Sequence, residues 1–548
     1  MTPLSRRAAL ATLLGSAPAA LLHGCGKPPS SLDGEIVGQS DALGHRLQQG
    51  WRPQPAPDAW QTTKVVIVGG GIAGLSAAWR LRRAGFTDFV LLELEREAGG
   101  TSRSGRSDVC AYPWGAHYVP APQKENAALV CLLTEMGVVE GTDAGGDPIV
   151  GEQFLCRAPQ ERIAYKGRWY EGLYLHAGAS AEDLRQFDAF QKEVDHWVAW
   201  RDGRGRRAFA IPTSAGSDDP DVRALDTMSM AEFLARKGLT SERLRWYVDY
   251  ACRDDYGTFL ADTTAWAGLF YFASRVPKPG EEAEPLLTWP EGNGRLVAYL
   301  LNAVSAQARL GVAATEVIPV ERDGRSRVDV TALERASQRA IGFHADRVVF
   351  AAPQFLAQYL IRPYREQPPA HVFEFHYAPW LVANLTLREH PGGLGFPLCW
   401  DNVFYESPSL GYVVATHQLG LECGPTVLTY YHAFCEANVR EARARLLDGT
   451  WQQWAEAVLA DVARVHPDIR TLVERLDVVR WGHAMVRPRT GFVWSLSRRK
   501  AAEPYRGIHF AHADLSGIAL FEEAYYHGLR AAEEVLCGLG APPAERFT

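Results

Sequence analysis

The chain has 548 residues, of which 47% are hydrophobic and 22% are charged, close to the averages for soluble globular proteins. Such a composition argues against wholesale disorder, a fibrous repeat and a protein with many membrane spans. The net charge of -7 argues against nucleic acid as the main partner, because phosphate binding requires a basic surface. Length alone suggests about three to four domains.

The nine cysteines are scattered along the chain, and none of them belongs to a CxxC or CxxCH pattern. This spacing counts against a zinc ribbon, a redox-active dithiol and an attached c-type haem. We therefore expect no metal site, and cysteines that are mostly free thiols.

Residues 1–24 are expected to form an export signal. Arg6 and Arg7 precede a mildly apolar stretch of fifteen residues, whereas a membrane-spanning helix needs about 20. The arginine pair resembles a twin-arginine signal, which directs folded proteins to export. Residues 22–25 resemble a lipobox that would lipidate Cys25, although His23 replaces the usual small residue; cleavage without lipidation is the alternative. We expect a tether over residues 25–60 and a periplasmic or membrane-anchored location.

A dinucleotide-binding motif begins near Lys64. Residues 65–68 are β-branched, as in a buried parallel strand, and a GxGxxG pattern and a predicted helix over 75–84 follow. A second strand over 89–92 leads to an acidic residue. The glycines permit the turn, the approach of a pyrophosphate and close helix–strand packing, while the acid binds the ribose hydroxyls. The residues assigned to the cofactor on this basis are Gly69, Gly71, Ile72, Ala73, Gly74 and Glu93.

The glycine pair six residues after Glu93 continues a pattern that resembles the flavin amine oxidase superfamily. That superfamily includes monoamine and polyamine oxidases, protoporphyrinogen oxidase and phytoene desaturases. Residues 289–296, 316–318, 345–353 and 508–536 resemble its later FAD-binding segments. The resemblance implies FAD as the cofactor. The residues that it adds to the cofactor site are Gly99, Gly100, Thr101, Ser102, Arg103, Trp114, Gly115, Ala116, His117, Val317 and Asp514.

The expected fold class is α/β, with a Rossmann-like FAD-binding domain built around a parallel sheet and interleaved with an α+β substrate domain. The blocks assigned to the FAD-binding domain are residues 61–120, 285–355 and 475–548, and those assigned to the substrate domain are 121–284 and 356–474. A capping box at Ser180–Asp183 and apolar spacing predict a helix over residues 181–197, and apolar spacing alone predicts one over 450–465. Strands are predicted over residues 381–387 and 411–416.

The resemblance implies an exported FAD-dependent oxidoreductase, with a polyamine or an amino-acid-like amine as the leading substrate. The sequence departs from the pattern of the superfamily's amine oxidases in two ways, and both weaken the assignment of an amine substrate. No lysine lies between Lys278 and Lys500, where many members of the superfamily place one beside the flavin, and the paired tyrosines of monoamine oxidases are not evident. The alternatives are a desaturase or protoporphyrinogen-oxidase-like enzyme that acts on a hydrophobic substrate, and an FAD-binding protein without catalysis.

Catalytic residues are not assigned by the sequence. The candidates are Trp481, His483, Tyr405 and Asn384, and residues 253–256 and Asp401 are further polar candidates. The expected partners are a small-molecule substrate and an electron acceptor, either oxygen or a membrane component, while the oligomeric state is left open.

Overall fold

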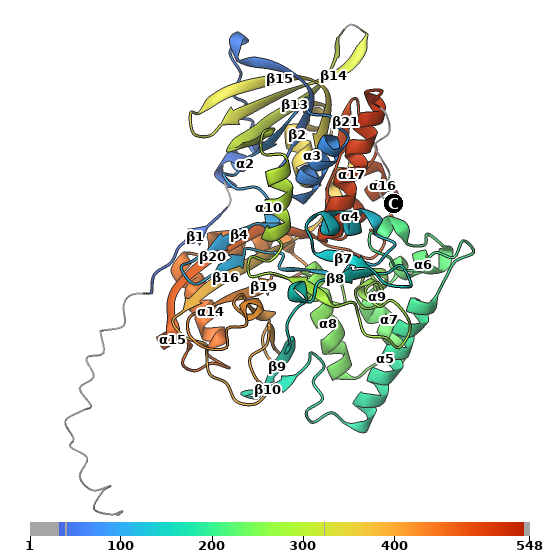
Figure 1. The fold of residues 1–548 in the computed structure, drawn as a ribbon, viewed down its shortest axis with the longest axis vertical. Coiled ribbons are helices and arrows are strands. Elements are labelled where there is room, and N and C mark those ends of the chain that lie inside the picture. The colour runs from blue at the N-terminus through green and yellow to red at the C-terminus, as the bar shows by residue number, and fades with distance from the viewer. Residues whose placement is uncertain (1–31, 39–40, 323, 542–548) are drawn as a thin grey trace, which may run out of the picture.

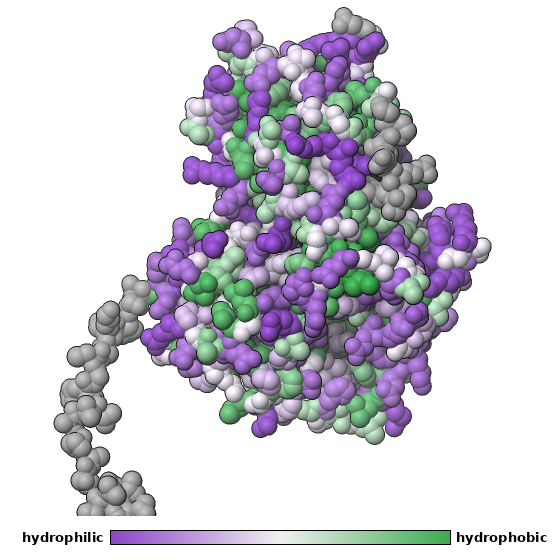
Figure 2. Space-filling model, viewed as in Figure 1, coloured by the Kyte–Doolittle hydropathy of each residue, from purple (hydrophilic) through white to green (hydrophobic). Residues whose placement is uncertain are grey.

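The computed structural model describes residues 32–38, 41–322 and 324–541 (Figure 1). The predicted export signal and Cys25 lie outside these residues. Two sheets organise the chain, one in the upper body and one in the lower body of Figure 1. Within the described ranges, no helix combines the length and the apolar character that crossing a membrane requires. In Figure 2, polar residues cover much of the visible face and apolar areas are small.

The upper sheet has seven strands and contains the dinucleotide-binding motif. Its parallel strands are β12 (Ala308–Leu310), β3 (Phe89–Glu93), β2 (Trp60–Val68), β15 (Arg339–Phe350) and β21 (Ile508–Phe510). The antiparallel strands β14 (Arg325–Glu334) and β13 (Val312–Arg322) extend the sheet beyond β15. Residues 65–68 of β2 are buried, as predicted from their β-branched run. The Rossmann-like parallel sheet is thereby confirmed.

Two helices pack together against this sheet. Helix α3 (Ile72–Arg83) follows the glycine motif, and α17 (Phe521–Gly538) lies along it (Figure 1). A Cβ atom at Gly528 would lie 2.3 Å from the carbonyl oxygen of Ala73, so the approach of the two helices requires glycine there. The last block of the chain is thus joined closely to the first.

The lower sheet has eight strands. In spatial order these are β1 (Ile36–Val37), β20 (Val473–Val486), β16 (Tyr377–Leu387), β19 (Thr426–Ala433), β18 (Gly411–Val414), β17 (Asp401–Phe404), β9 (Glu161–Tyr165) and β10 (Arg168–Glu171). The strands predicted over 381–387 and 411–416 correspond to β16 and β18. The α+β substrate domain is therefore built on a largely antiparallel sheet.

Helices complete the lower body. Helix α5 (Ala181–Ala199) begins at the predicted Ser180–Asp183 capping box and packs with α7 (Met230–Arg236), α8 (Glu242–Tyr256) and α9 (Ala265–Ala273) around one apolar core. Helix α14 (Trp451–Val462) begins as predicted but ends three residues earlier than the apolar pattern suggested. The buried residues of α14 pack against one face of the eight-stranded sheet.

The packing of the cores shifts three domain boundaries from their predicted positions. Strand β20 is hydrogen-bonded into the lower sheet, so residues 475–486 belong to the substrate domain. Helix α4 (Ala127–Glu135) packs with α3 and α17, and helix α11 (Gln354–Leu360) packs against the upper sheet. Side-chain burial, which the linear order of the motifs does not reveal, decides all three positions.

The segment before the dinucleotide motif is not the free tether that was predicted for residues 25–60. Strand β1 pairs with β20, and Arg475 forms ion pairs with Asp33 and Glu35. Helix α2 (Asp41–Gln48) then buries Leu43 and Leu47 against the upper body. Within the described residues, this segment therefore bridges the two bodies.

Candidate cofactor and substrate site

The glycine motif leaves an open space at the N-terminus of α3. Gly71 precedes the helix without a side-chain cap, so the first N–H groups of the helix have no capping partner. A Cβ atom at Gly71 would meet no atom within 4 Å, whereas one at Gly74 would lie 1.8 Å from the carbonyl oxygen of Gly69. Gly74 is therefore required for packing, and Gly71 borders space in which an anionic group can approach the helix.

A second glycine loop lies beside the first. The N–H of Gly99 donates to the carbonyl oxygen of Gly70 at 2.8 Å. Gly99 and Gly100 have φ angles of 115° and 57°, which favour glycine. Thr101 and Ser102 continue this loop as a short 3₁₀ turn. The loops at 69–71 and 99–102 thus form one continuous edge of the predicted cofactor site.

Glu93 stands at the end of β3, facing this edge. Its carboxylate accepts hydrogen bonds from the N–H groups of Gly70 and Glu95, both at 2.7 Å. Burial raises the pKa of Glu93, while the two N–H donors oppose that shift. The acid is therefore oriented by backbone at the position where a dinucleotide ribose is expected.

Arg103 is a buried cation that lacks an anionic hydrogen-bonding partner in the described part of the chain. It is 8% exposed, its Nε atom has no partner, and its guanidinium carbon lies 5.1 Å from the ring centre of Trp481. A Cβ atom at Gly38 would lie 2.9 Å from its Nη2 atom, so the N-terminal segment passes directly over Arg103. Burying an unpaired charge is costly, so this arginine suits a site that receives a phosphate group.

Asp514 joins three elements at the other end of the cofactor site. Its carboxylate accepts hydrogen bonds from the hydroxyl of Tyr377 at 2.6 Å and from the N–H of Gln354 at 2.9 Å, and lies 3.0 Å from His512 Nδ1. Burial raises the pKa of Asp514, but His512 and these donors outweigh burial and lower it. Val317, which the resemblance adds to the cofactor site, is buried in β13.

Residues 114–117 connect the cofactor edge to the lower sheet. The carbonyl oxygen of Trp114 accepts a hydrogen bond from Trp481 Nε1 at 2.7 Å, and that of Gly115 accepts one from the Tyr431 hydroxyl at 2.8 Å. The N–H of Ala116 donates to Thr101 on the cofactor loop at 2.9 Å. This segment is thereby held between the two bodies, as expected for a segment that lies along a flavin.

Two of the four candidate catalytic residues contact the same segment of the chain. Asn384 uses both ends of its amide, donating to Pro113 and accepting from Thr429. His483 stacks on Phe355, with ring centres 3.9 Å apart, and burial lowers its pKa to about 3. Trp481 donates to residue 114, and Tyr405 stacks on a neighbouring indole with centres 4.5 Å apart. Asn384 and Trp481 therefore both hold the segment at residues 113–114, whereas His483 and Tyr405 contact other residues, and the catalytic role of all four stays a prediction.

An acid cluster lies where the sequence indicated a substrate domain. It consists of Glu161 on β9, Asp254 on α8 and Asp401 on β17. Burial raises the pKa of Glu161 and of Asp254 to about 7, and raises that of Asp401 with a contribution from repulsion by the other two acids. Asp254 and Asp401 were noted from the sequence, but Glu161 was missed because no motif surrounds it.

Aromatic rings connect this acid cluster to the segment at 114–117. The ring of His117 lies 4.9 Å from that of Tyr431 and 5.4 Å from that of Trp400, which immediately precedes Asp401. Tyr250 donates a long hydrogen bond of 3.5 Å to Asp401. Burial lowers the pKa of His117 to about 4, so its imidazole is neutral at pH 7. The acid cluster therefore provides the negative charge in this region. The neutral rings of His117, Tyr431 and Trp400 form an aromatic wall beside it.

In a neighbouring buried ion pair, the two charges neutralise each other. Arg275 Nη2 lies 2.8 Å from Asp255 Oδ2, and its Nη1 atom donates to the hydroxyl of Tyr118 at 3.3 Å. Asp255 therefore has its own counter-ion, unlike the acid cluster. Among the described residues, no group of three or more His, Cys, Asp or Glu side chains has a metal-binding arrangement.

Comparisons with known proteins identify the first motif and the fold. Residues 67–131 match the family described as an NAD(P)-binding Rossmann-like domain. The chain is 41% identical over 100 residues to the peroxisomal N(1)-acetyl-spermine/spermidine oxidase of Bos taurus, covering 17% of this chain and 19% of that protein. It is 24% identical over 307 residues to polyamine oxidase 3 of Oryza sativa subsp. japonica, covering 53% and 52%. The match thus spans about half the length of the rice relative.

Solved structures extend the likeness of fold over most of the chain. A wild-type putrescine oxidase bound to putrescine superposes with a TM-score of 0.60 and 18% identity, covering 87% of this chain and 100% of the other. Cyclohexylamine oxidase from Brevibacterium oxydans IH-35A superposes with a TM-score of 0.59 and 15% identity, covering 87% and 99%. Both bodies of the molecule therefore have counterparts in these structures.

Proposed function

Because the chain has the fold of the flavin amine oxidase superfamily, we propose that it is an FAD-dependent oxidase of a cationic amine. The observation that carries this proposal is the acid cluster of Glu161, Asp254 and Asp401, which lies beside the aromatic wall at His117. Half-buried carboxyl groups that form no ion pair with a described residue favour a ligand that brings positive charge. A hydrophobic substrate would leave those acids unpaired.

The residues at the glycine edge fit FAD, the cofactor of this fold. Arg103 and the free N–H groups at the start of α3 would receive its phosphates, and Glu93 would bind a ribose. FAD, when bound, accepts the two electrons that amine oxidation releases. Oxygen or a membrane component then serves as the final electron acceptor in our proposal.

The chain's own residues would orient the amine. The acid cluster is an anchor for positive charge separate from the segment at residues 114–117, which favours a substrate with two amine groups, a diamine or polyamine. One charged end would be held at these acids while another amine lies toward residues 114–117. A neutral His117 adds no positive charge to repel it. Holding the substrate in one orientation is the contribution that the structure supports best.

Anaerobic reduction of the flavin tests this proposal. We expect putrescine or spermidine to bleach the yellow flavin of the purified protein, with 1,4-butanediol as the uncharged control of matched length. Bleaching by protoporphyrinogen or a polyisoprenoid, but by no amine, would support the desaturase alternative. A flavin that dithionite reduces and none of these compounds bleaches would indicate a protein that binds FAD without catalysis.

We also propose export through the twin-arginine route, followed by anchoring through lipidated Cys25. The support is the pair Arg6 and Arg7 ahead of a short apolar stretch and the lipobox-like sequence. Changing both arginines to lysine should leave the precursor in the cytoplasm, measured by fractionation and immunoblotting. Cys25→Ser is the companion variant, and we expect it to be exported but released from the membrane fraction. Normal export of the double lysine variant would refute the route.

A further inference from the structure

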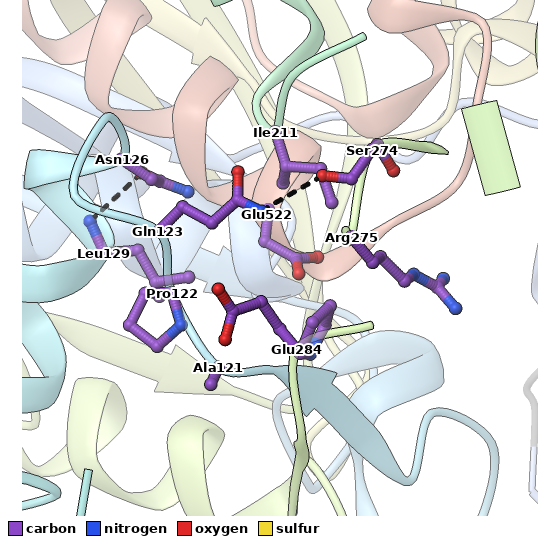
Figure 3. Close-up of a pocket in the computed structure, with 11 residues that line it drawn as sticks. Ala121, Pro122, Gln123, Asn126, Leu129, Ile211, Ser274, Arg275, Glu284 and Glu522 are labelled. Carbon is purple, nitrogen blue, oxygen red and sulfur yellow. Dashed lines mark hydrogen bonds between the residues drawn. The ribbon is translucent and has the colours of Figure 1, made fainter. Parts of the chain in front are cut away.

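A small cavity lies between the first turn of α17 and the loops at residues 120–126 and 274–284 (Figure 3). Its volume is about 20 Å³, room for one water-sized group such as an ammonium head. Two acidic residues, Glu522 and Glu284, line it, and Figure 3 shows them next to each other. This cavity, here called the Glu522 cavity, is distinct from the acid cluster of Glu161, Asp254 and Asp401.

Glu522 is buried without a partner on another described residue. It is 4% exposed, and the hydrogen bond that its carboxylate accepts comes from its own backbone N–H. The adjacent Glu523 is equally buried but fully bonded, accepting hydrogen bonds from the N–H of Thr213 at 2.6 Å, from its hydroxyl at 3.0 Å, and from Ser516. The contrast shows that this part of the fold satisfies a buried carboxylate where it can, and leaves Glu522 directed into the cavity.

The surrounding polar groups do not supply a counter-ion. Arg275 lines the cavity, but its guanidinium extends away from Glu522 and is paired with Asp255. Gln123 is also engaged, since its oxygen accepts from Arg207 and its nitrogen donates to the carbonyl oxygen of residue 274 at 3.4 Å. The two glutamates therefore form a negative site to which the described residues bring no free cation.

We propose that the Glu522 cavity binds a primary ammonium group, held between the carboxylates of Glu522 and Glu284. Its size suits an ammonium head, whose three N–H donors match carboxylate acceptors. The neighbouring walls include Pro122 and Leu129, which would contact an attached alkyl chain. The site goes beyond the proposed oxidation, because it would take an ammonium group whether or not the flavin turns over.

Proton binding opposes cation binding in this cavity. Burial raises the pKa of Glu522 to about 7. The hydrogen bond from its own backbone N–H and attraction from Arg275 oppose this shift, and repulsion from Glu523 and Asp255 adds to it. Burial also raises the pKa of Glu284. Repulsion from Asp147, Glu281 and Glu125 raises this pKa further, and attraction from Arg207 lowers it. Because the ionised carboxylates are the ligands, affinity for ammonium should increase as the pH rises through about 7.

Crystals of the FAD-loaded protein soaked in rubidium chloride provide the direct test. Rubidium is close in size to ammonium and scatters anomalously, so we expect an anomalous peak between the two carboxyl groups. Ammonium chloride, methylammonium chloride and putrescine, added separately, should each reduce the peak if they occupy the site. Displacement by ammonium alone would limit the ligand to the free ion, and displacement by all three would extend it to alkylammonium heads.

Calorimetric titration with methylammonium chloride is the measurement in solution. Glu522→Gln should weaken binding to this site at least tenfold, and Glu284→Gln, at a half-exposed position, provides a second variant if the first fails to fold. Asp401→Asn, which alters the acid cluster, should leave the rubidium peak in place. A cavity that shows no rubidium peak, or a Glu522→Gln variant that binds as the wild type does, would overturn the proposal while leaving the proposed oxidation untouched.

Discussion

Replacing Gly71 with leucine should yield a folded protein that has lost its flavin. A Cβ atom at this position meets no protein atom within 4 Å, so a side chain can leave the backbone there without a clash at its first carbon. The same space adjoins the open N-terminus of α3, where the cofactor phosphates are expected. We expect at least a hundredfold loss of FAD affinity, measured by titrating the apoprotein and by the ratio of absorbance at about 450 nm to that of the protein.

Two further glycine variants complete this experiment. Gly203→Leu places the same side chain at an exposed glycine whose Cβ also meets nothing within 4 Å, and should retain the flavin. Gly74→Ala should instead destabilise the fold, because its Cβ would lie 1.8 Å from a carbonyl oxygen. Circular dichroism and the melting temperature of the apoproteins separate loss of flavin from loss of fold. A Gly71→Leu protein with a full complement of FAD would show that the cofactor site is misplaced.

The double change Asp254→Asn and Asp401→Asn should raise the KM for putrescine about a hundredfold, with a smaller effect on kcat. Each hydrogen bond to a charged group contributes roughly 1.5–3 kcal/mol, and the loss of two neighbouring carboxylates removes most of the attraction for a distant ammonium group. Asparagine keeps the shape of each side chain, so the flavin content should not change. Steady-state kinetics with putrescine measure both constants.

The pH profile distinguishes an electrostatic role from a packing role. The pKa of Glu161 and that of Asp254 lie near 7 because the groups are buried, so at lower pH they are protonated and attract a cation weakly. In the wild type, kcat/KM should therefore rise as the pH increases through about 7, and the double variant should lose most of that rise. Asp188→Asn, on the exposed side of α5, is the matched control. An unchanged profile in the double variant would contradict the proposed role of the acid cluster.

The cofactor edge could be predicted from sequence because its chemistry lies in neighbouring residues. A strand, three glycines and the start of a helix are contiguous, and Glu93 follows at the end of the next strand. Turn geometry and hydrogen bonds within this short unit position each of them. Arg103 could be named from the resemblance to a family, and its burial beneath the N-terminal segment could not be predicted.

The acid cluster, in contrast, depends on contacts between distant parts of the chain. Glu161, Asp254 and Asp401 come from two strands and a helix. Pairing of β17 with β9 places Asp401 opposite Glu161, and Tyr250 of α8 donates to Asp401. None of the three belongs to a motif of its own. The predicted free tether failed for a related reason, since pairing of β1 with β20 depends on an edge formed more than 400 residues later.

Glu522 and Glu523 show most directly what the sequence determines and what only the tertiary structure determines. By itself, the sequence determined the dinucleotide-binding unit, the parallel sheet around it and the helix that contains these two glutamates. Identical side chains at adjacent positions cannot be told apart by composition or periodicity. Their directions differ by about 100° around the helix, so one carboxylate meets Thr213 and Ser516 while the other enters a cavity. Tertiary structure alone decided which acid is satisfied, because burial and partners are properties of the packed chain.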